Sequence, residues 1–137
     1  MNDRSFTTDI VVRFRDLDAM GHVNNAVMFT YFEEGRKAFF QSQFSSASAN
    51  DFPFILAHAR CDYLRPVALG NRPRLKMWIE DIGSKSFAIG YELAEVADPE
   101  TVYSRGRSVQ VCFDYRENRS VPISAEWRTV LEGYLRR

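Results

Sequence analysis

The sequence lacks an excess of charge of either sign, and it contains only two cysteines. Its 18 lysines and arginines are balanced by 18 aspartates and glutamates, which gives no electrostatic footprint for nucleic acid and excludes it as the main partner. Cys61 and Cys112 lie far apart and match neither a zinc-ligand nor a redox spacing. We expect both to be reduced core residues of a cytoplasmic protein.

The sequence also lacks a long apolar run, a secretory signal and a glycine-rich phosphate loop. No apolar stretch approaches the roughly 18 residues of a membrane helix, and the polar first residues lead straight into a strand pattern. Internal repeats, linkers and low-complexity tracts are missing too. The 137 residues therefore predict one domain over 1–137, without a membrane span, a bound metal or a cofactor.

The chain is rich in apolar and aromatic residues, at 45% and 14%, with eleven phenylalanines available for a core. Alternating apolar positions predict strands over residues 8–15, 54–65, 73–82, 86–96 and 101–114. Helical spacing predicts a long helix over 25–43 and a short one over 123–135, with a polar loop over Ser45–Asp51.

Most of the predicted strands are joined by short turns, which favours antiparallel neighbours. One enclosed helix and one curved antiparallel sheet make an α+β domain. In the last strand we expect Val109, Val111 and Phe113 to face inward and Gly106 to mark a bulge. Since a single sheet around one helix leaves edges uncovered, we expect a homo-oligomer formed by edge pairing or face packing.

The segment from residue 15 to residue 25 concentrates the reactive side chains between the first strand and the long helix. It holds two carboxylates, a glycine, an imidazole and two amides: Asp16, Asp18, Gly21, His22, Asn24 and Asn25. A carboxylate beside the positive end of a helix suits acyl-group chemistry, because an anionic intermediate can be held there. The same residue types also serve as turn formers and helix caps, the interpretation we keep for Asp16.

Three blocks, Val12–Asp18, Gly21–Asn25 and Tyr31–Glu33, follow one another in the order found in a known enzyme family. Weaker matches at Cys61–Pro66 and Arg105–Val111 continue that order. Together they resemble the hotdog-fold acyl-CoA thioesterases of the 4-hydroxybenzoyl-CoA thioesterase type. The resemblance implies five antiparallel strands wrapped around a long central helix, followed here by the short C-terminal helix. It also implies paired protomers that share one continuous sheet, as a homodimer or homotetramer, with active sites at the interface.

The resemblance further implies hydrolysis of an acyl-CoA thioester to a carboxylic acid and free coenzyme A. By this resemblance, the catalytic acid of the family matches Asp18, and the backbone amide that polarises the thioester carbonyl falls at Asn25. His22 is expected to orient substrate or water. Asp18 either attacks directly or deprotonates a water, and the sequence leaves both open. The expected substrate-binding residues are Gly21, Asn24, Tyr63 and Arg65.

Other assignments stay open from the sequence. Coenzyme A and acyl-carrier protein both fit as the thiol carrier. Glu33 is a reserve acid, and His58 is expected to be a structural hydrogen-bonding residue. Candidates for phosphate contacts, each also readable as surface charge, are Arg65, Lys85, Arg105 and Arg107. Candidates for an acyl pocket, each also readable as core, are Phe29, Phe32, Phe54 and Tyr63.

Two rival functions remain at this point. A hotdog-fold enoyl-thioester hydratase or dehydratase needs a second acid or base for proton transfer, and the sequence offers no convincing one. A non-catalytic acyl-thioester binding protein needs no acid at all, and the presence of Asp18 beside the helix start argues against it.

Overall fold

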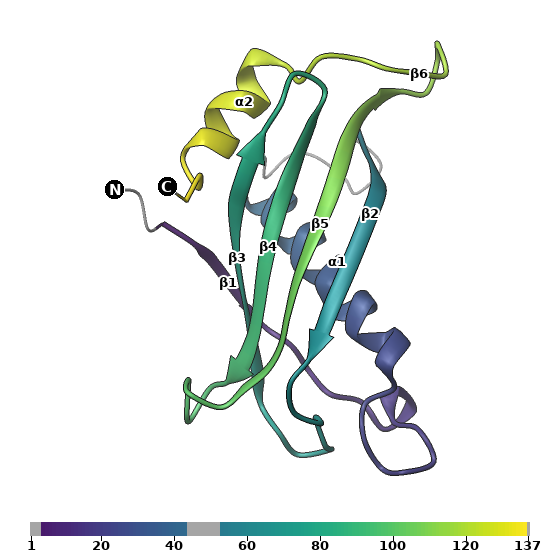
Figure 1. The fold of residues 1–137 in the computed structure, drawn as a ribbon, viewed down its shortest axis with the longest axis vertical. Helices are drawn as coiled ribbons and strands as arrows, with labels where there is room; N and C mark the ends of the chain where they lie inside the picture. The colour runs from purple at the N-terminus through teal and green to yellow at the C-terminus, as the bar shows by residue number, and fades with distance from the viewer. Residues whose placement is uncertain (1–3, 44–52, 137) are drawn as a thin grey trace.

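An antiparallel sheet and one long helix across its face form the two main layers of the protein (Figure 1). The computed structural model describes residues 4–43 and 53–136. The strands are β1 (Phe6–Asp9), β2 (Phe54–Tyr63), β3 (Pro73–Ile82), β4 (Ser86–Glu95), β5 (Val102–Asp114) and β6 (Arg119–Ser120). The helices are α1 (Asn25–Gln43) and α2 (Ala125–Glu132), and a 3-10 turn, η1, spans Phe14–Asp16.

The sheet has the order β1-β3-β4-β5-β2, and the short β6 pairs with β5. All of these pairings are antiparallel. This arrangement confirms the predicted α+β hotdog fold and adds only the two-residue β6 to the five expected strands. The predicted loop over Ser45–Asp51 lies outside the described residues.

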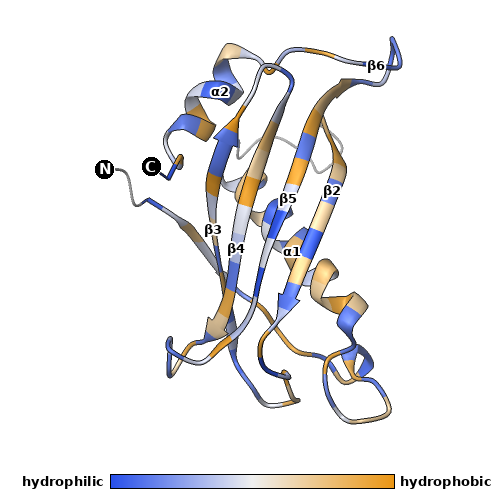
Figure 2. Cartoon of the chain, viewed as in Figure 1, coloured by the Kyte–Doolittle hydropathy of each residue, from blue (hydrophilic) through white to orange (hydrophobic). Residues whose placement is uncertain are grey.

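Helix α1 covers the concave face of the sheet and spans the range predicted from its apolar spacing. Its buried residues form one continuous face: Met28, Tyr31, Phe32, Gly35, Phe39 and Phe40. Gly35 lets the helix approach β3 closely, because a methyl group there would collide with Leu75 and Met77. The apolar bands seen along the central strands in Figure 2 meet this helical face and form the core.

The predicted first strand over residues 8–15 is wrong in its position. Strand β1 ends at Asp9, which pairs with Arg74, and the Ile10 amide then bonds the Pro73 carbonyl at 3.0 Å. Because β3 begins at Pro73, the chain beyond Ile10 has no strand to pair with. It turns instead into η1, where the Asp16 side chain bonds the Arg13 amide at 2.9 Å.

The predicted inward face of β5 is also wrong. The residues buried toward α1 are Ser104, Ser108, Gln110 and Cys112, so Val109 and its alternate neighbours point to the outer face. Gly106 is paired in regular register and marks no bulge. It is a glycine because the Phe32 ring lies against its Cα, where any side chain would collide.

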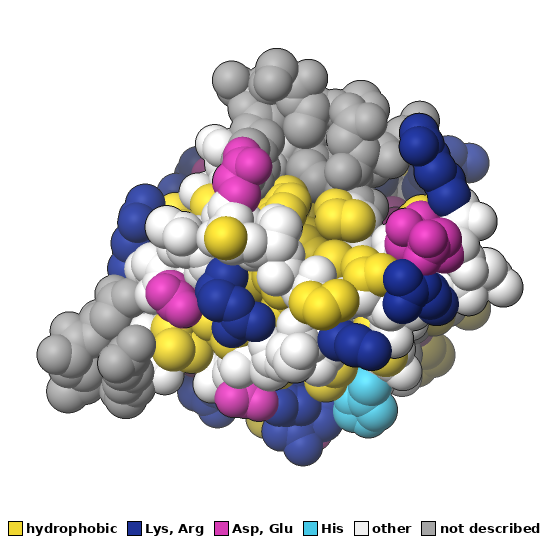
Figure 3. All heavy atoms as spheres, turned by 90° about the horizontal axis from the view of Figure 1, so that it is seen from above, with side chains coloured by type: hydrophobic (Ala, Val, Ile, Leu, Met, Phe, Trp, Pro, Cys, Tyr) yellow, Lys and Arg dark blue, Asp and Glu magenta, His cyan; other side chains and the backbone are white. Residues whose placement is uncertain are grey.

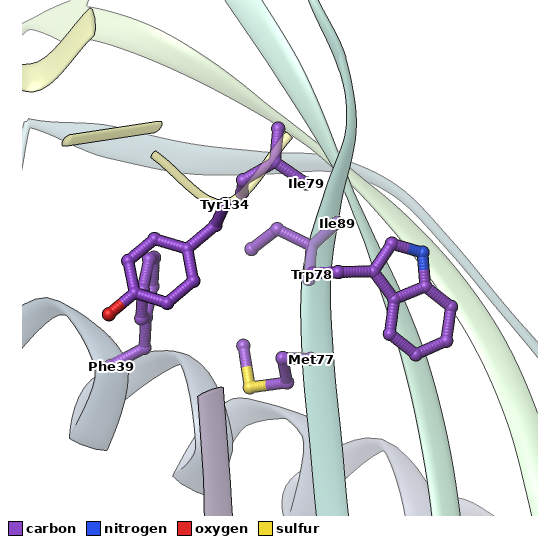
Figure 4. Close-up of a pocket in the computed structure, with 6 residues that line it drawn as sticks. All are labelled: Phe39, Met77, Trp78, Ile79, Ile89 and Tyr134. Carbon is purple, nitrogen blue, oxygen red and sulfur yellow. The ribbon is translucent and has the colours of Figure 1, made fainter. Parts of the chain in front are cut away.

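Helix α2 closes the upper end of the core. Ser124 caps it by accepting a 3.2 Å hydrogen bond from the Trp127 amide, and the helix is shorter than the predicted 123–135. Beyond it, Tyr134 packs edge-on against Phe39 of α1 with ring centroids 4.9 Å apart. Figure 4 shows Tyr134 and Phe39 facing the gap beside β3, while Trp78 projects from the opposite side of that strand. This gap leaves no volume for water, so it is packed core and not a ligand site.

The end of the molecule that carries α2 presents basic and acidic side chains interspersed around apolar ones (Figure 3). No field of a single sign dominates this face, in keeping with the balanced composition. Neither described helix has the length and apolar character needed to cross a membrane.

Candidate active site

A pocket of about 330 Å³ lies at the end of the molecule where α1 begins. Five of the seven predicted site residues line it: Asp18, His22, Asn25, Tyr63 and Arg65. They come from the loop before α1, the first residue of α1, the end of β2 and the loop after it. The fold thus brings together segments far apart in sequence, while Gly21 and Asn24 lie beside the pocket without lining it.

The loop from Asp18 to His22 is a closed turn. The Asp18 amide donates to the His22 carbonyl at 2.8 Å, and the Gly21 amide donates to the Asp18 carbonyl at 3.1 Å. Gly21 has a φ of 82°, a left-handed conformation that glycine adopts without steric cost. The turn brings Asp18 and His22 together among the residues that line the pocket.

The Asp18 carboxylate uses only one of its oxygens in the turn. Oδ1 accepts hydrogen bonds from the Met20 amide at 2.8 Å and the His22 amide at 3.3 Å. Oδ2 accepts none from any residue that the structure describes, and no ion pair holds this exposed side chain. Asp18 is therefore an Asx-turn residue that lines the pocket and keeps one carboxylate oxygen without a described partner.

The start of α1 is capped by Asn24, whose Oδ1 accepts from the Ala26 amide at 2.8 Å. The backbone of Asn24 is fixed in turn, because its amide donates to the Asp16 carbonyl at 2.8 Å. The next amide, that of Asn25, is the first of the helix and donates to no described residue. It is an unsatisfied donor at the positive end of the helix dipole, in a residue that lines the pocket.

Asp16 anchors the segment before the turn. This agrees with the prediction that Asp16 has a structural role. Its Oδ2 accepts a 2.7 Å hydrogen bond from the buried Tyr31 hydroxyl of α1 and the 2.9 Å bond from the Arg13 amide. Burial, reinforced by this carboxylate, raises the pKa of Tyr31 well above its ordinary value, so the phenol stays a donor. Burial also raises the pKa of Glu34 on the same helix.

Two further contacts tie the opposite rim to the helix start. The Tyr63 hydroxyl at the end of β2 donates to the Asn25 carbonyl at 2.7 Å. The Val23 amide donates to the Val67 carbonyl at 2.8 Å and joins the turn to the loop after β2. Arg65 supplies the only basic side chain, apart from the His22 ring, among the residues that line this pocket.

Cys61, two residues before Tyr63, offers no rival nucleophile at neutral pH. Burial raises the pKa of its thiol to about 11, so the reactive thiolate is scarce. Within residues 4–43 and 53–136 no group of three His, Cys, Asp or Glu side chains is placed to hold a metal ion. The reactive groups that the pocket does gather are a carboxylate, an imidazole, a free helix-terminal amide and a guanidinium.

The sequence profile of the thioesterase-like superfamily matches residues 12–131 of the chain. The chain belongs to this superfamily. It is an enzyme, a hotdog-fold thioesterase, and at the level of the family its activity is hydrolysis of acyl-CoA thioesters. The match confirms the resemblance drawn from the residues around Asp18.

Individual relatives agree with this assignment. A 1,4-dihydroxy-2-naphthoyl-CoA hydrolase from Nostoc punctiforme is 32% identical over 116 residues, covering 80% of this chain and 75% of that protein. A predicted thioesterase from Bacillus stearothermophilus superposes with a TM-score of 0.88 at 28% identity and covers 98% of each chain. A thioesterase from Thermus thermophilus, solved with coenzyme A and zinc, gives a TM-score of 0.82 at 29% identity, covering 93% of this chain and 92% of that one.

Several candidates lie away from the pocket of this thioesterase. Arg105 and Arg107 project from the outer face of the sheet, where they pair with Glu92 at 3.2 Å and Glu80 at 2.9 Å. Lys85 lies in the β3–β4 turn at the far end of the strands, and His58 is exposed in the middle of β2. The two arginines and Lys85 are surface charges, which leaves Arg65 as the phosphate candidate at the pocket.

The aromatic candidates divide in the same way. Phe32 stacks on Tyr91 at 4.4 Å, and Phe54 packs edge-on against Phe87 at 4.9 Å, so both belong to the core. Phe29 instead lines a second, smaller pocket together with Glu33. Of the four aromatic residues considered for an acyl site, only Tyr63 lines the main pocket.

Sequence reasoning missed the apolar part of the site. The additional lining residues are Met20, Val23, Met28, Leu64, Pro66 and Val67. Met20 is 79% exposed in an otherwise polar turn, and Leu64 is 49% exposed. A large apolar side chain in a polar loop beside the candidate acid was a readable signal, because such exposure on a folded protein often marks a binding surface.

Proposed function

We propose that this thioesterase hydrolyses an acyl-CoA thioester to a carboxylic acid and free coenzyme A, with Asp18 as nucleophile or general base. One observation carries the proposal: a carboxylate oxygen of Asp18 and the amide of Asn25, both without described partners, belong to residues of one pocket. The first can deliver or activate the attacking oxygen, and the second can stabilise the oxyanion that forms.

The chemistry requires few groups. The thioester carbonyl accepts a hydrogen bond from the Asn25 amide, and its carbon is attacked by Asp18 Oδ2 or by a water that Asp18 deprotonates. One preorganised amide donor on the oxyanion is worth roughly 3 kcal/mol. The tetrahedral intermediate then expels the coenzyme A thiolate. If Asp18 attacks directly, water hydrolyses the resulting mixed anhydride and restores the carboxylate.

The remaining pocket residues have supporting roles in this proposal. His22 orients the water or the thioester, and Arg65 meets a phosphate of coenzyme A at the exposed rim. Gly21 and Asn24 contribute through the backbone, Gly21 by closing the turn and Asn24 by capping α1. Tyr63 holds the end of β2 against the helix start. The apolar residues Met20 and Leu64 shield the reacting carbonyl from bulk water.

We infer a homodimer formed through the edge of β2. This ten-residue strand pairs with β5 on one side, and its other edge has no partner strand among the described residues. A long open edge favours pairing with a second copy, which would extend the sheet across both protomers. The main pocket includes Tyr63 of this strand, so a partner docked there would adjoin the site. The two free cysteines fit a cytoplasmic protein.

The test is release of free thiol from a panel of acyl-CoA thioesters by the wild type, Asp18→Asn and Asp18→Ala. We expect both variants to fold and to lose activity on the order of 10²- to 10⁴-fold. Asp81→Asn, which changes an exposed aspartate on β3 away from the pocket, serves as the matched control. Addition of water to an enoyl-CoA without thiol release would select the hydratase instead. Tight binding without any turnover would select a non-catalytic binder.

A further inference from the structure

A second pocket, of about 160 Å³, opens farther along the seam between α1 and β2. The residues that line it are Phe29, Thr30, Glu33, Arg36, Leu56 and Ala59. The same two elements frame the active site, where Tyr63 of β2 bonds Asn25 of α1. An acyl chain that leaves the reacting carbonyl and follows this seam therefore meets the second pocket next.

Arg36 is the cation of this second pocket, and its environment is unusual. Its Nη1 donates a 3.0 Å hydrogen bond to the Tyr91 hydroxyl. None of the carboxylates in the described part of the chain forms an ion pair with it, although Glu33 lines the same pocket. A guanidinium has five N–H donors in a fixed fork, so several of them remain available on a half-buried side chain.

A buried chain of hydrogen bonds holds Arg36 in place. The Tyr91 hydroxyl bonds the Ser108 hydroxyl at 2.6 Å, Ser108 donates to the Gln110 side chain, and Gln110 donates to the Phe87 carbonyl at 3.2 Å. These three polar side chains are at most 2% exposed. Polar groups buried in a small core are costly unless every one is bonded, and this chain satisfies them while fixing one end of the guanidinium.

We propose that Arg36 selects acyl groups that carry a hydroxyl at their far end, an inference that rests on the proposed thioesterase function. Asn25 and Arg36 are separated by roughly 16 Å along the helix axis, which suits an extended chain of medium length. Phe29, between them, contacts the apolar part of the chain. At the far end Arg36 donates a hydrogen bond to the hydroxyl oxygen, and the hydroxyl donates one to the Glu33 carboxylate. A hydroxyl can both accept from Arg36 and donate to Glu33, whereas a terminal carboxylate can only accept and would lie beside the charge of Glu33.

The test compares dodecanoyl-CoA with its ω-hydroxy and ω-carboxy derivatives by thiol release. We expect the wild type to favour the ω-hydroxy substrate in kcat/KM by about tenfold to a hundredfold, as a hydrogen bond to a charged group allows. Arg36→Met should abolish this preference, so that the ratio of kcat/KM for the ω-hydroxy and plain substrates falls to about one. Lys37→Met, at the exposed neighbouring position, is the matched control and should retain the preference.

Three results would overturn the assignment. One is equal hydrolysis of the hydroxylated and plain substrates by the wild type, and another is preference for the ω-carboxy derivative. The third is an equal loss on all substrates in Arg36→Met together with a changed oligomeric state, which would place Arg36 in subunit association. Binding of the same thioesters to Asp18→Asn, measured calorimetrically, keeps the test separate from the proposed function. Hydroxyl selectivity in binding would survive even if no substrate were hydrolysed.

Discussion

Tyr63 at the end of β2 and Asn25 at the start of α1 are joined by a 2.7 Å hydrogen bond from the phenol to the backbone carbonyl. This bond joins two of the elements that frame the main pocket. It holds the carbonyl of Asn25, the residue whose N–H, one peptide unit earlier, is the proposed oxyanion donor. The position of that donor therefore depends on a side chain that need not touch the reacting atoms.

Replacing this phenol tests the dependence directly. Tyr63→Phe keeps the ring and removes the bond, which is worth about 0.5–1.5 kcal/mol. We expect kcat for a good acyl-CoA substrate to fall roughly twofold to tenfold, since a displaced oxyanion donor weakens transition-state stabilisation. The free energy of unfolding, measured in urea, should change by less than about 1.5 kcal/mol. Tyr115→Phe, at an exposed tyrosine near β6, should leave kcat unchanged. An unaltered kcat in Tyr63→Phe would show that the bond does not position the donor.

Substitution of two glycines with positive φ distinguishes an effect on stability from an effect on activity. Gly21 (φ 82°) closes the turn that carries Asp18, whereas Gly70 (φ 96°) lies in the loop before β3, and an added methyl group would meet no atom at either site. Gly21→Ala and Gly70→Ala should each lower the free energy of unfolding by about 1–2 kcal/mol because of backbone strain alone. Only Gly21→Ala should also reduce kcat/KM markedly, because it shifts Asp18. Equal activity in the two variants would contradict the role of this turn.

The sequence predicted the elements that depend on local pattern and missed those that depend on neighbours. Helix α1 over residues 25–43 and the alternation of β3 and β4 follow from apolar spacing, which those residues carry themselves. The end of β1 depends on where β3 begins, at Pro73, and no local signal near Asp9 records that. The inward face of β5 was missed because Ser108 and Gln110 are polar. Their burial depends on hydrogen bonds to Tyr91 and Phe87 of β4, which the sequence of β5 does not reveal.

The site shows the same division. The turn around Asp18 and the cap at Asn24 lie close together in sequence, so their residue types and spacing predict them. The opposite rim comes from Tyr63 and Arg65, which only the family resemblance placed near the turn. The second pocket was not foreseen, because Arg36 reads as an ordinary polar-face residue of an amphipathic helix until its bond to Tyr91 is seen.

The contact of Gly106 with Phe32 predicts a compensating pair of substitutions. Gly106→Ala places a methyl group against the Phe32 ring and the Arg60 carbonyl, and overpacking of this kind costs about 1–3 kcal/mol of stability. Phe32 also stacks on Tyr91, so it has little freedom to move away. The double variant Gly106→Ala, Phe32→Leu should be more stable than the sum of the two single changes predicts. A double-mutant cycle in urea measures this, and strict additivity would show that Phe32 is not the obstacle.

Tyr31 and Asp16 predict a change of stability at alkaline pH. Burial, followed by the hydrogen bond to Asp16, raises the folded-state pKa of Tyr31 above the unfolded value near 10. The neutral phenol is therefore favoured by folding, and its contribution is fully present below about pH 10 and is lost as the pH rises beyond it. Tyr31→Phe should be about 1 kcal/mol less stable than the wild type at pH 7, and this difference in stability should narrow above pH 10.

Urea unfolding at pH 7, 9 and 10.5 measures the difference in stability, with Tyr115→Phe as a control in which an exposed phenol is removed. A stability difference that stays constant or widens with pH would mean that burial and the contact with Asp16 do not hold the Tyr31 phenol neutral.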